Sequence, residues 1–211
     1  MFATLSQRQV LALECLSPAF YQRATVAVAR ELLGTLLVRV LPEGVVAVRL
    51  TEVEAYLGVD DPAAHTYRGR RTARNASMWG EGGRLYVYFT YGLHHCANVV
   101  TRRAGEPEAV LLRGGVAVAG GELVRARRGG RNDLLGPAKL CQGLGIDRSL
   151  DGIPLTRQSG LWLARDGWSA TGASPVELPR VGVGYAGEAA AWPLRFVLPS
   201  APPPAVGDTA P

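Results

Sequence analysis

The chain has 211 residues, enough for one well-buried core and few for two full domains. With 47% hydrophobic and 19% charged residues it can bury enough apolar surface to fold, which excludes a disordered tail. The formal net charge of +5 suits polyanionic partners, but many ordinary proteins share such a charge.

Turn residues and apolar periodicity predict the secondary structure in chain order. We expect a loosely attached N-terminal segment at 1–16, a helix at 17–34, strands at 36–41 and 45–57, a surface loop at 58–83, two strands within 84–101, a strand at 109–114, short helices within 121–146, strands at 161–164 and 193–198, and a proline-rich tail at 201–211. No internal repeat or linker divides the chain, so residues 17–200 are predicted to form a single domain.

The second predicted strand contains two carboxylates, Glu52 and Glu54, in the run TEVEAY. The period of two along a strand places both on one face and Val53 and Ala55 on the other, toward the core. On an exposed face both glutamates would be ordinary surface charges. Beside Tyr56, a partly desolvated carboxylate would instead suit a general base.

Aromatic residues and arginines form a second pattern that bears on ligand binding. Tyr86 and Tyr88 share one face of a predicted strand, where they either pack in the core or form a stacking surface for a flat ligand such as a base. Arginines recur in the long loop and again between residues 102 and 131. Arginine runs among aromatics in a basic chain favour nucleic acid as a partner.

Several other site types are not supported by the sequence. Adjacent residues of a strand point to opposite faces, so His94, His95 and Cys96 do not predict a metal site. Glycine-rich signatures for nucleotide cofactors are absent, and we expect neither metal nor cofactor. The odd number of cysteines and the absence of a C-x-x-C pair argue against a disulfide framework, so we expect a cytoplasmic protein, which a nucleic-acid partner would make nucleoid-associated. No run approaches the roughly 18 apolar residues that a spanning helix needs, so we expect it to lie outside membranes.

Five motifs in fixed order resemble those of the alkyladenine (3-methylpurine) DNA glycosylases. They are TEVEAYLGVDDPAAH, RLYVYFTYGLHHCANVV, AVLLRG, GPAKLCQGLGI and RVGVGYAGE followed by PLRF, which together span most of residues 32–198. The resemblance implies an α+β fold, a single compact domain with a curved, mostly antiparallel sheet and short peripheral helices. It also implies a monomeric base-excision repair enzyme that flips an alkylated purine, or a deaminated one such as hypoxanthine, out of double-stranded DNA. The enzyme would hydrolyse the N-glycosidic bond without strand cleavage.

The resemblance also implies roles for individual residues. Glu54 aligns with the base that activates water, Arg113 with an arginine that helps to hold the water, and the Val181 carbonyl with a third water contact. The base pocket would be formed by Tyr56, His65 (through its main-chain amide), Tyr88 and Asn98, with Tyr91 as the intercalating wedge and Arg70, Arg74 and Lys139 as phosphate contacts. Glu52 receives no role. The loops at 65–75 and 99–109 look longer than the family pattern.

Two alternatives remain open at this level. A binding module without catalysis could stack bases on Tyr88 and Tyr91. A glycosylase with lyase activity could use Lys139, the sole lysine, as a Schiff-base amine.

Overall fold

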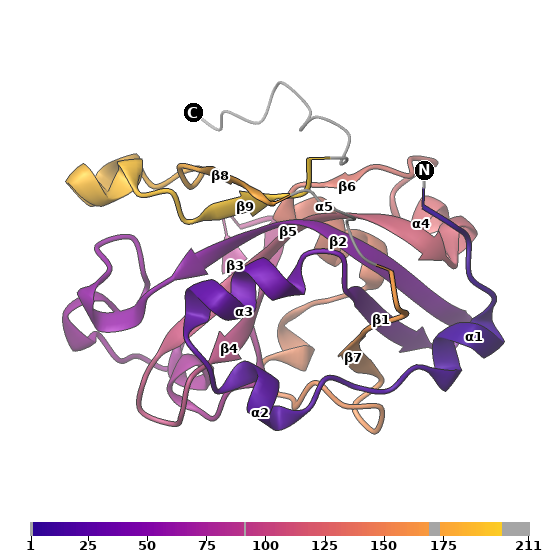
Figure 1. Ribbon diagram of the computed structural model, residues 1–211, viewed down its shortest axis with the longest axis horizontal. Helices are drawn as coiled ribbons and strands as arrows, with labels where there is room; N and C mark the ends of the chain where they lie inside the picture. Colours follow the sequence, from indigo (N-terminus) through magenta and orange to yellow (C-terminus); the bar gives the residue numbers. More distant parts are fainter. Residues whose placement is uncertain (1, 91, 169–173, 200–211) are drawn as a thin grey trace.

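One sheet of nine antiparallel strands organises residues 2–90, 92–168 and 174–199, the part of the chain that the computed structural model describes. The path through the sheet is β3-β4-β5-β2-β1-β7, with β6 paired to β5 and the β8–β9 hairpin paired to β2 (Figure 1). The strands are β1 Leu36–Leu41, β2 Gly44–Tyr56, β3 Leu85–Thr90, β4 His94–Thr101, β5 Glu108–Ala119, β6 Leu134–Leu135, β7 Leu161–Ala164, β8 Val176–Leu178 and β9 Arg195–Val197. This confirms the predicted α+β class.

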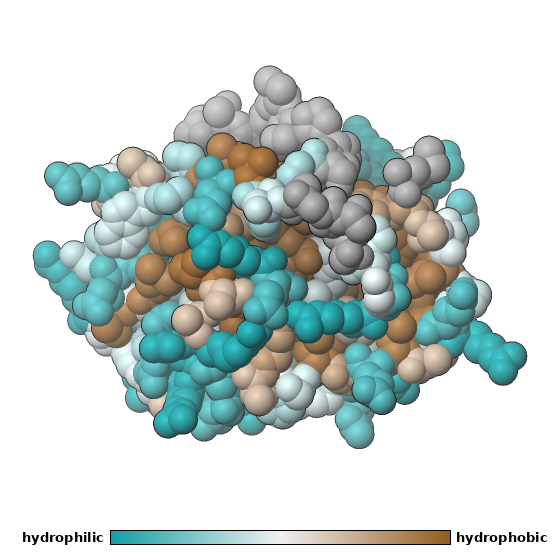
Figure 2. Space-filling view, in the orientation of Figure 1, coloured by the Kyte–Doolittle hydropathy of each residue, from teal (hydrophilic) through white to brown (hydrophobic). Residues whose placement is uncertain are grey.

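Short helices surround the sheet. They are α1 Gln7–Ala12, α2 Pro18–Tyr21, α3 Thr25–Leu32, α4 Gly121–Arg127 and α5 Pro137–Leu144, with 3-10 helices η1 Gly58–Asp60, η2 Tyr67–Gly69, η3 Ala76–Trp79, η4 Arg148–Leu150 and η5 Gly184–Ala191. Apolar residues of α3, α4 and α5 share the main core with the sheet, whereas α1 packs in a second cluster with β1 and β7. Hydrophilic side chains divide the hydrophobic ones visible in Figure 2 into separate patches. No helix among the described residues is long and apolar enough to cross a membrane.

The N-terminal third of the chain differs from the prediction in two places. Two helices, α2 and α3, replace the single helix expected at 17–34, because the carbonyls at the end of α2 bond outside the helix: Arg23 Nε donates to the Phe20 oxygen at 3.0 Å and the Arg102 amide to the Tyr21 oxygen at 2.9 Å. The segment before it is not loosely attached, since Val10 is fully buried on the sheet. The expected tail at 201–211 lies outside the described residues.

Strand β2 changes its core-facing side halfway along. Val46, Val48 and Leu50 pack in the main core, and so do Val53 and Ala55. Even-numbered residues therefore give way to odd-numbered ones, which a regular strand does not permit. The change occurs at a β-bulge: Leu50 pairs with Gly115 and Glu52 with Gly114, so Thr51 has no partner on β5.

The bulge determines the position of the two carboxylates. Without the extra residue, Glu52 and Glu54 would follow Leu50 into the apolar core. With it, they lie on the opposite face. A second irregularity follows at once on the partner strand, where Glu52 pairs with Gly114 and Val53 with Leu112, leaving Arg113 without a partner in the register.

The close contact between the strands at this bulge predicts that Gly115→Ala is destabilising. A Cβ at Gly115 would lie 2.4 Å from Val48 Cγ1 and 2.5 Å from the Arg49 carbonyl oxygen, so the backbone has to shift. We expect the free energy of unfolding to fall by about 1 to 3 kcal/mol, the usual range for overpacking. Urea unfolding measures it.

Gly121→Ala is the matched control, because a Cβ there meets no atom within 4 Å and Gly121 begins α4. That variant should be neutral or slightly more stable, since alanine restricts the unfolded chain. Equal stability of the two variants would contradict the assigned packing.

Candidate active site

An open pocket of about 1120 Å³ lies on the face of the sheet to which the bulge turns Glu54. Its walls come from β2, β3, β4, β5, the start of α5 and the segment at 181–185. The structure brings most of the predicted site residues together here: Tyr56, His65, Arg74, Tyr88, Asn98, Arg113, Lys139 and Val181 all line it. Tyr91, the predicted wedge, lies outside the described residues.

Glu54 is fully buried and contacts three residues that line this pocket, Tyr56, Arg113 and Val181. The Val181 amide donates to its Oε1 at 2.8 Å, and the Tyr56 hydroxyl donates to its Oε2 at 2.9 Å. Arg113 Nη1 lies 3.4 Å from Oε1. Both carboxylate oxygens are therefore held in place, and the reading of Glu54 as an ordinary surface charge is wrong.

Burial dominates the electrostatics of Glu54. Desolvation raises the pKa of its carboxyl, while the Arg113 charge, the Val181 amide and the Tyr56 hydroxyl oppose the rise. The neighbouring charge of Glu52 adds to it. A carboxylate with a raised pKa accepts a proton more readily, which is the property that a general base needs.

The aromatic wall beside Glu54 is built from β3 and the long loop. The rings of Tyr86 and Tyr88 lie 5.5 Å apart on the shared face that the strand period predicted. His65 meets Tyr88 edge-on at 4.6 Å, and its Nδ1 shares a hydrogen bond of 2.8 Å with the Tyr86 hydroxyl. Burial, with Arg74 and Arg70 nearby, lowers the pKa of His65, which favours the neutral ring. The buried Asn98 donates to the Tyr86 carbonyl at 3.1 Å.

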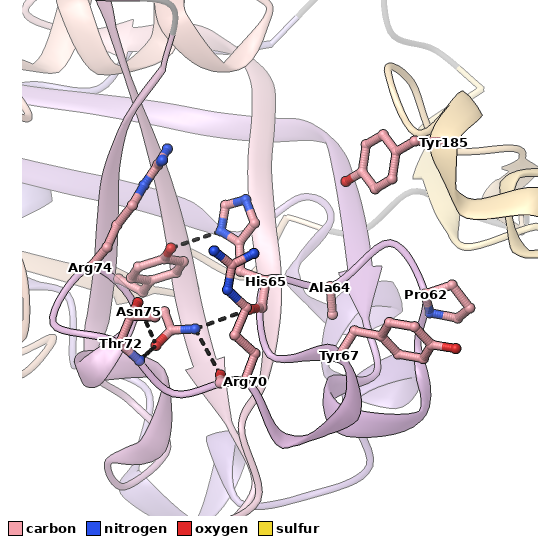
Figure 3. Close-up of a pocket in the computed structure, with 10 residues that line it drawn as sticks. Pro62, Ala64, His65, Tyr67, Arg70, Thr72, Arg74, Asn75 and Tyr185 are labelled. Atoms are coloured by element: carbon pink, nitrogen blue, oxygen red, sulfur yellow. Dashed lines mark hydrogen bonds between the residues drawn. The ribbon is translucent and has the colours of Figure 1, made fainter.

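The loop at 58–83 is ordered by a buried asparagine that the sequence reasoning missed. Asn75 Nδ2 donates to the carbonyls of His65 and Arg70, each at 3.0 Å, and its Oδ1 accepts from the Thr72 amide at 2.8 Å (Figure 3). These bonds close the loop into a compact unit that holds His65 at the pocket. In the sequence, the only indication of this role was that asparagine before a short helix often forms a turn.

A buried ion pair, which the sequence did not predict either, joins the two sides of the site. Arg180 binds Asp61 through two bonds, Nη1 to Oδ2 at 2.5 Å and Nη2 to Oδ1 at 2.9 Å, and both side chains are fully buried. The Arg180 guanidinium also lies over the Tyr56 ring at 4.8 Å. The segment that holds Val181 is thereby fastened to the loop that leads to His65.

The three predicted phosphate contacts lie at the rim. Arg74 donates to the Phe89 carbonyl at 2.8 Å, and Lys139 lies 3.0 Å from Asp133 Oδ2. Arg70 lines an adjoining pocket of about 350 Å³, which Tyr185 faces from η5 (Figure 3). Their role in binding phosphate stays a prediction.

Neither a metal cluster nor a disulfide is found in the described part of the chain. No group of three or more His, Cys, Asp or Glu side chains there could hold a metal ion. The cysteines Cys15, Cys96 and Cys141 are free thiols.

Comparison with known proteins points to one family. Residues 19–202 match the family described as methylpurine-DNA glycosylase (MPG). The chain is 43% identical over 180 residues to a Bdellovibrio bacteriovorus protein named "Putative 3-methyladenine DNA glycosylase", covering 85% of this chain and 92% of that protein. It is 40% identical over 196 residues to the human protein named "DNA-3-methyladenine glycosylase", covering 87% of this chain and 65% of the human one.

The raised pKa of Glu54 predicts that Glu54→Gln stabilises the protein at neutral pH. A carboxyl with a higher pKa in the folded state binds its proton more tightly there, so ionised Glu54 lowers stability as the pH rises above the unfolded value. Glutamine has the same shape without the charge. Thermal unfolding should show a higher Tm for the variant at neutral pH, and the difference should shrink as the pH falls.

Glu31→Gln is a control for which we expect the opposite effect on stability at neutral pH. The Arg23 hydrogen bond lowers the pKa of Glu31, so this group stabilises the fold above its unfolded pKa and loses that effect in acid. A lower Tm for Glu54→Gln than for wild type at neutral pH would contradict the assigned shift.

Proposed function

Because this chain belongs to the methylpurine-DNA glycosylase family, we propose that it excises alkylated purines from DNA by a water molecule that Glu54 activates. Membership of the family makes the protein a DNA-repair glycosylase, a hydrolase that acts on DNA. The observation that carries the finer proposal is the fully buried Glu54 carboxylate, held by Arg113, Tyr56 and the Val181 amide, three residues that line an aromatic-walled pocket.

The proposed substrate is a nucleotide flipped out of the duplex. Extruding a base costs a few kcal/mol of stacking and pairing, least for a damaged base. Stacking on Tyr56, Tyr88 and His65 offsets this cost, since each base–aromatic contact contributes about 1 to 3 kcal/mol. Asn98 at the pocket wall would crowd a purine that has a 2-amino group. We assign Tyr91 the role of filling the gap left in the stack.

In the proposed reaction, the water oxygen forms a bond to the sugar C1′ as the bond from C1′ to the purine nitrogen breaks. Glu54 takes the proton of the water, and Arg113 and the Val181 carbonyl help to hold that water. The purine leaves with the bonding electron pair. A 3-methyladenine base is already cationic and departs without further protonation, so one carboxylate suffices where glycosidases ordinarily use two.

Excision of hypoxanthine requires a protonation that a cationic methylpurine does not need. Hypoxanthine is neutral in DNA, so it has to gain a proton before or as the bond breaks. Burial lowers the pKa of His65, so a smaller fraction of its ring carries a proton that it could give. We therefore propose cationic methylpurines, the lesion named in its relatives, as the preferred substrates.

A Glu54→Gln variant tests the proposal directly. Duplex DNA with methylated purines, and separately with a single hypoxanthine, is incubated with excess enzyme and then treated with alkali to cut abasic sites. Wild type should produce breaks only after alkali, and Glu54→Gln should lose excision by at least about 100-fold while it still binds DNA. Breaks from both proteins would remove Glu54 from the mechanism, and binding without breaks from either would favour a binding module.

Lys139→Ala separates the glycosylase from a lyase. An ammonium paired with Asp133 at the rim is better suited to a phosphate than to attack on C1′. We expect unchanged single-turnover excision at saturating enzyme, weaker DNA binding and a smaller dependence of affinity on salt, with a slope reduced by about one. Arg157→Ala, at an arginine bonded to the Leu13 carbonyl away from the pocket, is the control. Loss of excision in Lys139→Ala would support the lyase.

A further inference from the structure

Glu52 is a buried carboxylate to which the proposed excision chemistry assigns no step. Its side chain is 6% exposed and lies on the same face of β2 as Glu54, two residues earlier. Two neighbouring carboxylates repel each other, and burial strengthens that repulsion. The repulsion is compensated by two arginines from other strands, Arg113 of β5 and Arg195 of β9.

Arg113 is bound more closely by Glu52 than by Glu54. Its Nε donates to Glu52 Oε1 at 2.9 Å, whereas its Nη1 lies 3.4 Å from Glu54 Oε1. A bond at Nε, next to the aliphatic stem, fixes the direction of the rigid guanidinium fork. Glu52 therefore determines where the outer end of Arg113 lies, and that end is the one beside Glu54.

Arg195 extends the network to the other donor of Glu54. Its Nη1 lies 3.1 Å from the same Oε1 of Glu52, and its Nε donates to the Pro179 carbonyl at 2.9 Å. Pro179 stands two residues before Val181, whose amide donates to Glu54. The contacts thus connect Glu52 through Arg113 on one side, and through Arg195 and Pro179 on the other, to two of the groups that hold Glu54.

From these contacts we propose that Glu52 is the positioning residue of the site: with Arg195 it holds Arg113 and the segment at 179–181 against Glu54. The inference rests on the proposed role of Glu54 as the base. Glu52 touches neither the water nor the sugar in this scheme, so it acts on the rate only through Glu54 and Arg113, by their placement and by the ionisation of Glu54.

The ionisation of Glu54 reports on this network. The groups that interact electrostatically with it are Glu52 and Tyr56 on β2, Tyr88 on β3, Cys96 on β4, Arg113 on β5 and Arg180 before Val181. Of these, Glu52 is the like charge that raises the pKa of Glu54, and Arg113 is the opposite charge that lowers it. A change at Glu52 therefore moves the acid limb of the pH profile, which a merely structural residue would not do.

The test compares Glu52→Ala, Glu52→Gln and Arg195→Gln by single-turnover excision on methylated duplex across a pH series, with duplex affinity measured separately. Glu52→Ala should slow excision on the order of 100-fold at unchanged affinity, the usual effect of a misplaced catalytic group. Glu52→Gln keeps an oxygen for Arg113 Nε, so it should regain most of the rate. Its acid limb should move to lower pH, because the repelling charge is gone while Arg113 stays.

Asp166→Asn is the matched control, since it removes the carboxylate charge from a comparably buried pair with Arg49, at 2.5 Å, that does not reach the pocket. It should lower the Tm without moving the acid limb. If Glu52→Ala does not fold, Glu52→Gln and Arg195→Gln test the proposal. A wild-type rate and an unmoved acid limb in the folded Glu52 and Arg195 variants would overturn the inference.

Failure of the proposed function is recognised separately. Wild type and Glu54→Gln are run on the same DNA, and equal excision by both would refute the role of Glu54 whatever the Glu52 variants do. An active wild type with an inactive Glu54→Gln and unaffected Glu52 variants would refute only the positioning role.

Discussion

The pair of register irregularities between β2 and β5 is the constraint on which the site depends. An unpaired Thr51 exchanges the two faces of β2, and an unpaired Arg113 follows directly on β5. A regular pairing would bury two carboxylates among valines and leucines, where unpaired charges are strongly unfavourable. The bulged pairing turns them instead toward an arginine and an open pocket. Bulges next to active sites often re-aim side chains in this way.

Once turned to the pocket, Glu54 is still buried, and its properties follow from that burial. Desolvation raises its pKa, and the Arg113 charge, the Val181 amide and the Tyr56 hydroxyl oppose that rise. Placing a carboxylate there lowers the stability of the folded protein at neutral pH, because the isosteric neutral side chain would not need compensation. The same placement makes the carboxylate a better base. Stability and reactivity are opposed at this residue for one physical reason.

Buried polar contacts hold the walls of the pocket in place. The long loop is ordered by Asn75 within itself and by Asp61 toward Arg180, and its Ala63 and Met78 pack in two small apolar clusters. Removing one partner of such a buried pair leaves an uncompensated charge, so the two sides of the site depend on each other. The network from Glu52 to Arg195 works in the same way beside Glu54. The segments of the site are thus joined by charged and amide groups as well as by small apolar clusters.

The sequence by itself determined the strand hairpin, the later strands at 84–101 and 161–164, the α+β class and the family, because period-two alternation, turn residues and ordered motifs are local properties. It also pointed to Glu54, Tyr56 and Tyr88 as one site. It did not reveal the break between α2 and α3, the burial of Glu54 or the partners of Glu52, which lie 61 and 143 residues away. Only the tertiary structure decided these, since burial and long-range pairing depend on which distant strands become neighbours. A period of two cannot disclose a bulge, because the extra residue is recognised only against the strand that pairs with it.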